Sequence, residues 1–279
     1  MEKYTLIGHP LGHSMSPFIH AELFKLSGIE AEYDCTDIPG EEFSSRMADL
    51  KKLNGYNITI PYKRDIIPHI DVLDESAKRY NSVNCVHNRD GRAVGYNTDC
   101  DGFLLSVKAK SLCLSGNVLL VGCGGVGRMM AIEAALHGAE ITIGIIPEAA
   151  SAAADLCDEI HFLKPECKTH VKPIDKVTGS FDLIINASPV GMYPKTDACP
   201  VSAELIGRCG GVFDAVYNPV KTKILQIAES FGKPAVNGTA MLVYQAVKAH
   251  EIWNGSSYTP EQVQDIIDKT NEIIAGDFK

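Results

Sequence analysis

With 279 residues, the chain is long enough for one large or two medium domains, and at this length about three quarters of the unfolded surface can be buried. A formal net charge of -9 argues against nonspecific binding to nucleic acid or to an anionic membrane surface, because both are themselves negative. No run of about 18 apolar residues occurs, and the N-terminus resembles a strand rather than a signal peptide. We therefore expect a cytoplasmic protein whose partner is a small molecule.

Nine cysteines are scattered from Cys35 to Cys209, an odd number without a Cys-x-x-Cys spacing. This pattern predicts reduced thiols and neither a disulfide framework nor a zinc site. His9, His13 and His20 lie close together in the sequence, but their spacing matches no zinc pattern. We therefore expect no metal cofactor.

The first hundred residues alternate strand-like and helix-like patterns, which favours βαβαβ organisation around a parallel sheet. Two strand-like segments, 82–87 and 93–96, flank Asn88-Arg89-Asp90-Gly91, a turn signal that predicts an antiparallel hairpin and hence a mixed sheet. The earlier elements are expected as a strand over 4–8, a helix from Pro17 with Ser16 as its N-cap, a strand over 32–36, a helix over 41–53 and a strand over 56–60.

A second unit begins with an apolar strand over 118–121, which runs through a glycine-rich loop into a helix over 125–137 and a strand over 140–143. This is the context that a dinucleotide-binding fingerprint requires. The segment 159–174 fits no clear pattern. Later elements are expected as a helix over 148–156, strands over 181–187, 211–216 and 235–236, and helices over 241–253 and 261–275 that return to the first domain.

The glycine-rich loop predicts a dinucleotide whose pyrophosphate approaches a helix N-terminus. The second strand of such a unit usually ends near an acidic residue for the ribose 2′-hydroxyl of NAD or near an arginine for the 2′-phosphate of NADP. Here Gly144-Ile145-Ile146-Pro147-Glu148 offers neither in that position, and Glu148 would repel an added phosphate. The cofactor could therefore be NAD or NADP, and these residues favour NAD. The loop residues expected at the cofactor are Gly122, Gly124, Gly125, Gly127 and Arg128.

Lys63 and Asp99 each close a short segment rich in Asn and Thr, at 57–63 and 97–99. An ammonium group can donate to a carbonyl oxygen as it gains negative charge, while a carboxylate orients the lysine and helps to move protons. Such a pair suits reversible alcohol–ketone redox chemistry. The alternative is that both are solvated surface charges, as most Lys and Asp residues are.

Two hydroxyls, those of Ser14 and Ser16, lie at the predicted start of the first helix, where a carboxylate could accept hydrogen bonds. The alternative is that Ser16 only caps the helix. Tyr217 and Gln245, taken alone, are consistent with a loop aromatic and a helix-surface amide.

Taken together, six separated motifs resemble the shikimate dehydrogenase family, in the family's order from Tyr4 to the C-terminal helices. This agreement is far more specific than a glycine fingerprint alone. The motifs are Gly8-His9-Pro10 through His13-Ser14-Met15-Ser16-Pro17, Asn57 through Lys63, Ser82-Val83-Asn84, Asn97-Thr98-Asp99, Asn186 through Met192, and Val216-Tyr217-Asn218-Pro219 with Met241-Leu242-x-x-Gln245.

The resemblance implies a two-domain α/β fold. Residues 1–99 and 238–279 would form an α/β substrate domain with a mixed sheet, and residues 100–237 a Rossmann dinucleotide-binding domain. It also implies reversible NAD(P)-dependent reduction of 3-dehydroshikimate to shikimate, in the biosynthesis of aromatic amino acids.

The same resemblance implies roles for individual residues. Lys63 and Asp99 would perform acid–base catalysis, and Ser14 and Ser16 would hold the substrate carboxylate. The remaining roles implied are binding of the ring hydroxyls by Thr59, Asn84, Tyr217 and Gln245, and binding of the cofactor by Ser188 and Met192.

Three departures from the family pattern keep alternatives open. Ile145-Ile146-Pro147 stands where the family usually has Asn-Arg-Thr for the 2′-phosphate of NADP, Asn81 through Cys85 departs from Gly-Ala-Val-Asn-Thr, and Gly238-Thr239-Ala240 replaces a more glycine-rich segment. The main alternative is a quinate/shikimate dehydrogenase-type paralogue that prefers NAD. A second is a noncatalytic ligand sensor, and a homodimer is left open beside a monomer.

Overall fold

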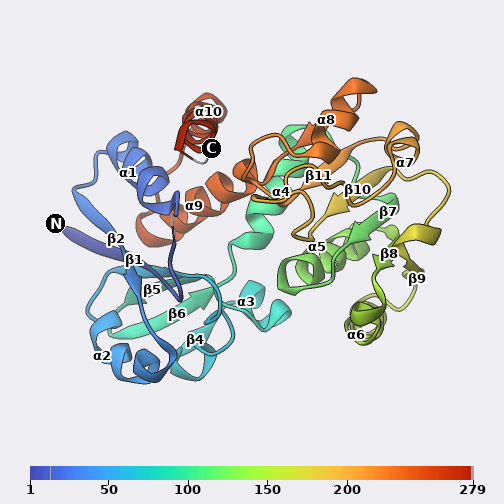
Figure 1. Ribbon diagram of the computed structural model, residues 1–279. Helices are drawn as coiled ribbons and strands as arrows, with labels where there is room; N and C mark the ends of the chain where they lie inside the picture. The colour runs from blue at the N-terminus through green and yellow to red at the C-terminus, as the bar shows by residue number, and fades with distance from the viewer. Residues whose placement is uncertain (13, 278–279) are drawn as a thin grey trace. The chain divides into compact units, whose positions relative to one another are not determined.

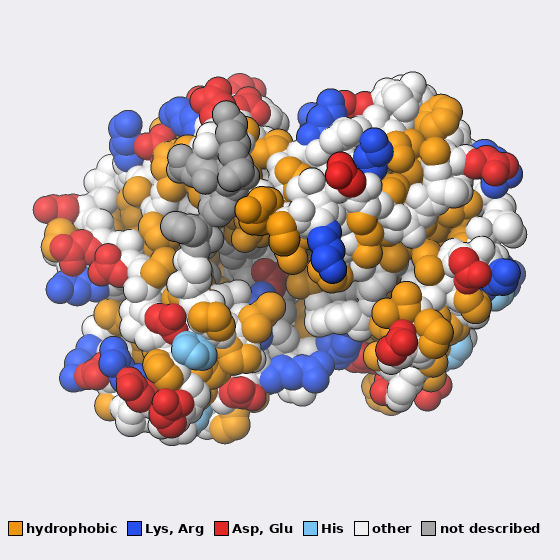
Figure 2. Space-filling model, viewed as in Figure 1, with side chains coloured by type: hydrophobic (Ala, Val, Ile, Leu, Met, Phe, Trp, Pro, Cys, Tyr) orange, Lys and Arg blue, Asp and Glu red, His pale blue; other side chains and the backbone are white. Residues whose placement is uncertain are grey.

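The computed structural model describes residues 1–12 and 14–277, so His13, which the metal argument included, lies outside the described residues. The chain divides into two compact units (Figure 1). The first comprises Met1–Gly102 and Leu242–Thr270, and the second comprises Phe103–Met241 and the chain from Asn271. On the face shown in Figure 2, acidic and basic side chains are interspersed rather than separated by sign.

The first unit is built on a mixed six-stranded sheet, as the hairpin signal predicts. β1 (Glu2–Gly8) lies between two parallel neighbours, β2 (Ala31–Asp37) and β3 (Gly55–Ile58). β5 (Cys85–Arg89) is antiparallel to both β3 and β6 (Arg92–Tyr96). The hairpin turn uses Asp90 at φ 53° and Gly91 at φ 73°, the left-handed pair that a tight hairpin favours. The order of the strands is β2-β1-β3-β5-β6-β4, with β4 at Val72–Leu73.

Both faces of this sheet are covered. On one face, the Tyr4 ring stacks on Trp253 of α9 at 4.5 Å and packs on Phe24 of α1. On the other, Ile7 and Phe43 belong to a second buried cluster, which includes residues of η1 and α2. Figure 1 shows α1 and α9 on one side of the sheet and α2 on the other. The bounds are α1 Ser16–Ser27, η1 Gly40–Arg46, α2 Met47–Leu50, η2 Ile67–His69, α3 Glu75–Tyr80, α9 Gly238–Asn254, which begins in the second unit, and α10 Pro260–Asp277.

The second unit has an all-parallel sheet in the order β12-β11-β10-β7-β8-β9. In chain order this is the 3-2-1-4-5-6 arrangement of a Rossmann fold, whose switch point lies between β7 and β10. Ligands of such sheets bind beyond the carboxyl ends of the strands at that point. The strands are β7 Gly116–Val121, β8 Ala139–Ile145, β9 Thr169–Pro173, β10 Leu183–Asn186, β11 Val212–Asp214 and β12 Ala235–Val236.

Helices cover both faces of the parallel sheet. Leu119 of β7 packs with residues of α7 and α8, while its neighbour Leu120, which alternation places on the opposite face, is equally buried. α5 contacts β7, β8 and α6. The helices are α4 Asp99–Ala109, which begins in the first unit, α5 Gly125–Leu136, η3 Pro147–Ala149, α6 Ala150–Leu163, η4 Ile174–Lys176, α7 Ala203–Gly207 and α8 Lys223–Ser230. The expected fold class, α/β with a mixed sheet and a Rossmann-type sheet, is confirmed.

Two local predictions were wrong. Ser16 is the first residue of α1 rather than its N-cap, and the Ser14 hydroxyl, two residues earlier, accepts the Ser16 N–H at 3.2 Å. The single helix expected over 41–53 is a 3-10 helix followed by the short α2. There the Ser45 hydroxyl donates to the Glu42 carbonyl at 2.7 Å, a side-chain bond that competes with regular helix formation.

Candidate active site

Three chain segments meet at one edge of the first sheet. β3 and β6 run in the same direction, and β5 runs against both, so the ends of β3 and β6 and the start of β5 share this edge. Lys63 follows β3, Asp99 follows β6, and Asn84 immediately precedes β5. The sheet therefore brings together residues from the three motifs.

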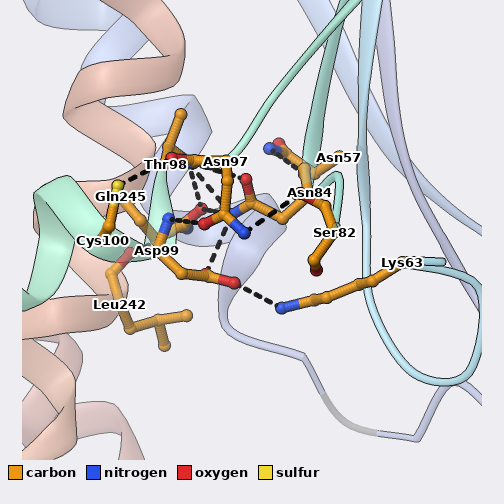
Figure 3. A network of polar contacts seen from close by, with 10 residues as sticks. All are labelled: Asn57, Lys63, Ser82, Asn84, Asn97, Thr98, Asp99, Cys100, Leu242 and Gln245. Carbon is orange, nitrogen blue, oxygen red and sulfur yellow. Dashed lines mark hydrogen bonds and ion pairs between the residues drawn. The ribbon is translucent and has the colours of Figure 1, made fainter. Parts of the chain in front are cut away.

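Lys63 and Asp99 form a direct ion pair at this edge (Figure 3). Lys63 Nζ donates to Asp99 Oδ2 at 2.6 Å, and the two side chains are 24% and 16% exposed. The backbone carbonyl of Lys63 accepts the Val83 N–H at 2.7 Å, which ties the turn after β3 to the segment before β5. The pair is thus partly shielded from water yet still accessible, as an acid–base pair must be.

The buried Asn84 amide fixes the other carboxylate oxygen. Its Nδ2 donates to Asp99 Oδ1 at 2.9 Å, and its Oδ1 accepts the Thr98 N–H at 2.6 Å. Because both ends of the amide are used, the orientation of the Asp99 carboxylate is set by its hydrogen bonds and not only by the Lys63 charge.

Gln245 on α9 and Asn97 complete the network in Figure 3. Gln245 Oε1 lies 3.4 Å from Thr98 Oγ1, which donates to it. The Asn97 Oδ1 accepts the Asp99 N–H at 3.1 Å, one of the free donors at the start of α4. Asn97 and Thr98 were not expected as site residues, although the predicted Asn97-Thr98-Asp99 motif contains both.

The predicted carboxylate site lies in the same unit. Ser14 is half-buried and Ser16 is buried, at the start of α1. Thr59 follows β3 and is half-buried. In the described ranges, no hydrogen bond joins either serine to Lys63 or Asp99. Tyr217 lies in the second unit, so its predicted contact with substrate stays a prediction.

The glycine loop has the shape that a dinucleotide needs. Gly122 has φ 92°, in the left-handed region that favours glycine. A Cβ at Gly127 would lie 2.0 Å from the Gly122 carbonyl oxygen, so only glycine lets α5 pack this closely on the loop. A Cβ at Gly124 or Gly125 would meet nothing within 4 Å. The loop is therefore open beside the N-terminus of α5, and these residues fit a pyrophosphate.

Ser188 and Met192 follow β10, the strand next to β7 at the switch point. The Ser188 N–H lies 2.7 Å from where a Cβ of Gly122 would be, so Ser188 borders the glycine loop. Its hydroxyl donates to Asn186 Oδ1 at 2.6 Å. Met192 is 45% exposed.

Arg128, expected to add positive charge at the loop, is bonded to a carboxylate. Its Nε donates to Glu159 Oε2 at 2.6 Å, and its Nη2 bonds Glu159 Oε1. The β8 strand ends at Ile145, Ile146 is 58% exposed, and Glu148 is exposed.

A buried carboxylate lies at the end of β11. Desolvation raises the pKa of Asp214 to about 6, although Thr222, Val216 and Asn186 all donate to it and so favour its charged form. Loss of hydration therefore outweighs three hydrogen bonds at this group.

All nine cysteines are free thiols. Within residues 1–12 and 14–277, no three His, Cys, Asp or Glu side chains gather as metal ligands. Nor does any helix of that range have the length and apolar character needed to cross a membrane.

Comparison with known proteins gives a consistent result. The family model described as "Shikimate dehydrogenase substrate binding domain" matches residues 6–86. The shikimate dehydrogenase (NADP(+)) of Clostridium beijerinckii is 36% identical over 256 residues, which are 91% of this chain and 92% of that protein.

Solved structures show the same similarity over nearly the whole chain. Shikimate 5-dehydrogenase from Thermus thermophilus, in complex with NADP(H) and shikimate, has a TM-score of 0.86 and 31% identity, covering 97% of this chain and all of that one (100%). The ligand-free 5-ketofructose reductase of a Gluconobacter strain has a TM-score of 0.83 and 28% identity, covering 96% of this chain and 98% of that one.

Proposed function

This chain belongs to the shikimate dehydrogenase family, and from that premise we propose that it catalyses the reversible reduction of 3-dehydroshikimate to shikimate. The hydride carrier is a nicotinamide dinucleotide, and the reaction serves the biosynthesis of aromatic amino acids. The observation that carries this proposal is the Lys63–Asp99 pair, which the Asn84 amide orients at the edge of the first sheet.

The two units take different tasks in this proposal. The mixed-sheet unit binds the substrate, because it holds Lys63, Asp99 and the serine motif, Ser14 with Ser16. The Rossmann-type unit binds the dinucleotide at the switch point between β7 and β10. The functional boundaries are proposed as 1–99 with 238–279 for substrate and 100–237 for dinucleotide.

Lys63 is the proton donor in the reductive direction. When bound, the reduced dinucleotide supplies a hydride to the carbonyl carbon of the substrate. The Lys63 ammonium donates its proton to the carbonyl oxygen, which takes the electron pair of the C=O π bond and becomes the hydroxyl. In the oxidative direction the neutral Lys63 amine accepts that proton.

Asp99 acts through Lys63. Its Oδ2 holds the ammonium in place at 2.6 Å and stabilises its positive charge. Because Asn84 holds Oδ1, the carboxylate does not rotate away when the lysine changes charge. The network thereby keeps the Nζ proton aimed at one place, which is the geometric requirement for general acid catalysis.

The carboxylate and the ring hydroxyls of the substrate are matched to protein side chains that can form hydrogen bonds with them. Ser14 and Ser16 donate hydroxyl hydrogen bonds to the substrate carboxylate. Thr59, Tyr217 and Gln245 contact the ring hydroxyls. Asn84 already uses both ends of its amide within the protein, so it orients Asp99 in addition to bordering the substrate.

The dinucleotide is held by the glycine loop. A Cβ at Gly124 or Gly125 would meet nothing within 4 Å, and the backbone N–H groups of these two residues bind the pyrophosphate. Ser188 and Met192 border the same switch point from the end of β10. The Clostridium beijerinckii relative is named for NADP(+), whereas this chain has Ile145-Ile146-Pro147 at and beyond the end of β8, so the carrier is NAD or NADP.

A cytoplasmic location is part of the proposal. The nine cysteines are all free, as the reducing conditions of that compartment maintain.

Initial rates test the function directly. Shikimate and quinate are each oxidised with NAD+ and with NADP+ at matched concentrations. The proposal predicts that shikimate is oxidised faster than quinate with at least one carrier. Faster oxidation of quinate would identify the chain as a quinate-type paralogue. Tight binding of shikimate without turnover would identify a sensor.

A further inference from the structure

An ion pair links the first turn of α5 to α6 in the second unit. Arg128 follows Gly127 directly, and its guanidinium makes two contacts with the Glu159 carboxylate, one of them Nε to Oε2 at 2.6 Å. The two side chains are only 17% and 28% exposed. This is the two-point geometry in which an arginine is held most firmly by a carboxylate.

The segment between these two helices is otherwise without positive charge. No Lys or Arg occurs from Met129 to Leu163. Beyond the end of β8, where the ribose 2′-group of a bound dinucleotide lies, the chain presents the exposed Ile146 and the carboxylate of Glu148. A 2′-hydroxyl tolerates these neighbours, whereas a 2′-phosphate would face the repelling charge of Glu148, and the segment itself supplies no attracting one.

Arg128 starts close to this place. The Cys123 Sγ of the glycine loop donates to the Ala149 carbonyl, with 3.9 Å between sulfur and oxygen. The glycine loop therefore lies against the segment that follows β8. Arg128 follows this loop in the first turn of α5, and Glu159 holds its guanidinium.

We propose that Glu159 determines which carrier the chain uses. By holding Arg128, it keeps that guanidinium from a 2′-phosphate, and the second unit therefore binds NAD+ more tightly than NADP+. Removing the Glu159 charge breaks this ion pair and shifts the preference towards NADP+. This inference rests on the proposed function, since it requires a dinucleotide in the glycine loop.

Equilibrium binding, measured by calorimetry without substrate, tests the inference independently of turnover. The ligands are NAD+ and NADP+, and the proteins are the unaltered chain, Glu159→Gln, and Glu159→Gln with Arg128→Ala. We expect Glu159→Gln to tighten NADP+ binding by about tenfold and to change NAD+ binding by less than about twofold. The added Arg128→Ala should abolish the gain.

Two further variants keep the test interpretable. Glu204→Gln removes a carboxylate on α7 of the same unit that pairs with Arg208, the residue after that helix, and it should leave the ratio of the two dissociation constants unchanged. If Glu159→Gln does not fold, Glu159→Asp carries the test, because the shorter side chain weakens the bidentate contact while keeping the charge. It should tighten NADP+ binding by a smaller factor.

Several outcomes would overturn the inference. One is an unchanged ratio in the Glu159 variants. Another is a gain that survives Arg128→Ala, which would assign the phosphate to a different cation, such as Lys172 of β9 opposite Gly144. Binding of neither dinucleotide would remove this inference and the proposed function together. Normal binding with no shikimate oxidation would remove the proposed function alone, and the ratio would still decide the role of Glu159.

Discussion

The Lys63 ammonium lies 2.6 Å from the Asp99 carboxylate although the two residues are 36 positions apart in the chain. The strand order explains this, since β3 and β6 run in the same direction and end at the same edge of the sheet. The Lys63–Asp99 ion pair is therefore a product of the mixed topology of the first unit.

The charge of the Asp99 side chain can be tested separately from its size and shape. Asp99→Asn keeps the size of the side chain and an oxygen for the Asn84 amide, but it removes the charge that holds the lysine. We expect kcat to fall by about a hundredfold, with little change in the free energy of unfolding. Steady-state kinetics on shikimate check this. Asp49→Asn, at an exposed surface pair with Lys52, is the matched control and should have normal kcat.

The serine motif makes a different prediction. Ser14→Ala combined with Ser16→Ala removes the two donors proposed for the substrate carboxylate. These two hydrogen bonds would form equally in the ground state and the transition state. The KM for shikimate should therefore rise by about tenfold or more while kcat changes little. Substrate saturation curves test this. An unchanged KM would place the carboxylate elsewhere.

The Asn84 side chain is expected to stabilise the fold, because it accepts a hydrogen bond from a buried backbone N–H group. Asn84→Ala leaves the buried Thr98 N–H without its acceptor at 2.6 Å, and we expect a loss of about 2 kcal/mol in the free energy of unfolding. Urea titration measures this loss. Asn54→Ala is the control, because that amide accepts the Lys3 N–H at an exposed position and should cost well under about 1 kcal/mol. Equal losses for both variants would show that the network contributes little to stability.

Asp214 predicts a pH dependence of stability. Burial raises its pKa from 3.8 to about 6, so between these values the folded chain binds a proton that the unfolded chain has released. The contribution of this group therefore falls as pH rises from about 4 to about 6, by roughly 2–3 kcal/mol, and is constant above.

Asp214→Asn isolates this effect because the amide does not titrate. The free energy of unfolding, measured by urea titration for both proteins, should fall relative to the variant as pH rises through this window. A difference that stays constant with pH would contradict the raised pKa.

Much of this architecture follows from local sequence signals. Strand periodicity and the Asp90-Gly91 turn predicted the mixed sheet, and the glycine spacing after 118–121 predicted the Rossmann-type unit. Helices α3, α4, α7 and α8 were not predicted. α3 and α7 have 6 and 5 residues, too few to show a clear helical period.

The candidate active site was also predicted only in part from the sequence. The residues Lys63 and Asp99 were predicted, but not the way that Asn84 orients the carboxylate, because side-chain hydrogen bonds depend on strand register. Arg128 shows the opposite case. Its sequence position predicted a charge for the cofactor, whereas Glu159, 31 positions away, binds it in the structure. Contacts between distant segments of this kind leave no periodic signal in the sequence.

The most direct test of the central claim is the turnover of shikimate by the unaltered chain and by Lys63→Ala, measured side by side with NAD+ and NADP+. Lys78→Ala, in an exposed pair with Glu75, serves as the control. The account predicts turnover by the unaltered chain and the control, and a fall of about a hundredfold or more for Lys63→Ala in protein that remains folded. Turnover by Lys63→Ala close to that of the unaltered chain, or no turnover by the unaltered chain with either carrier, would contradict it.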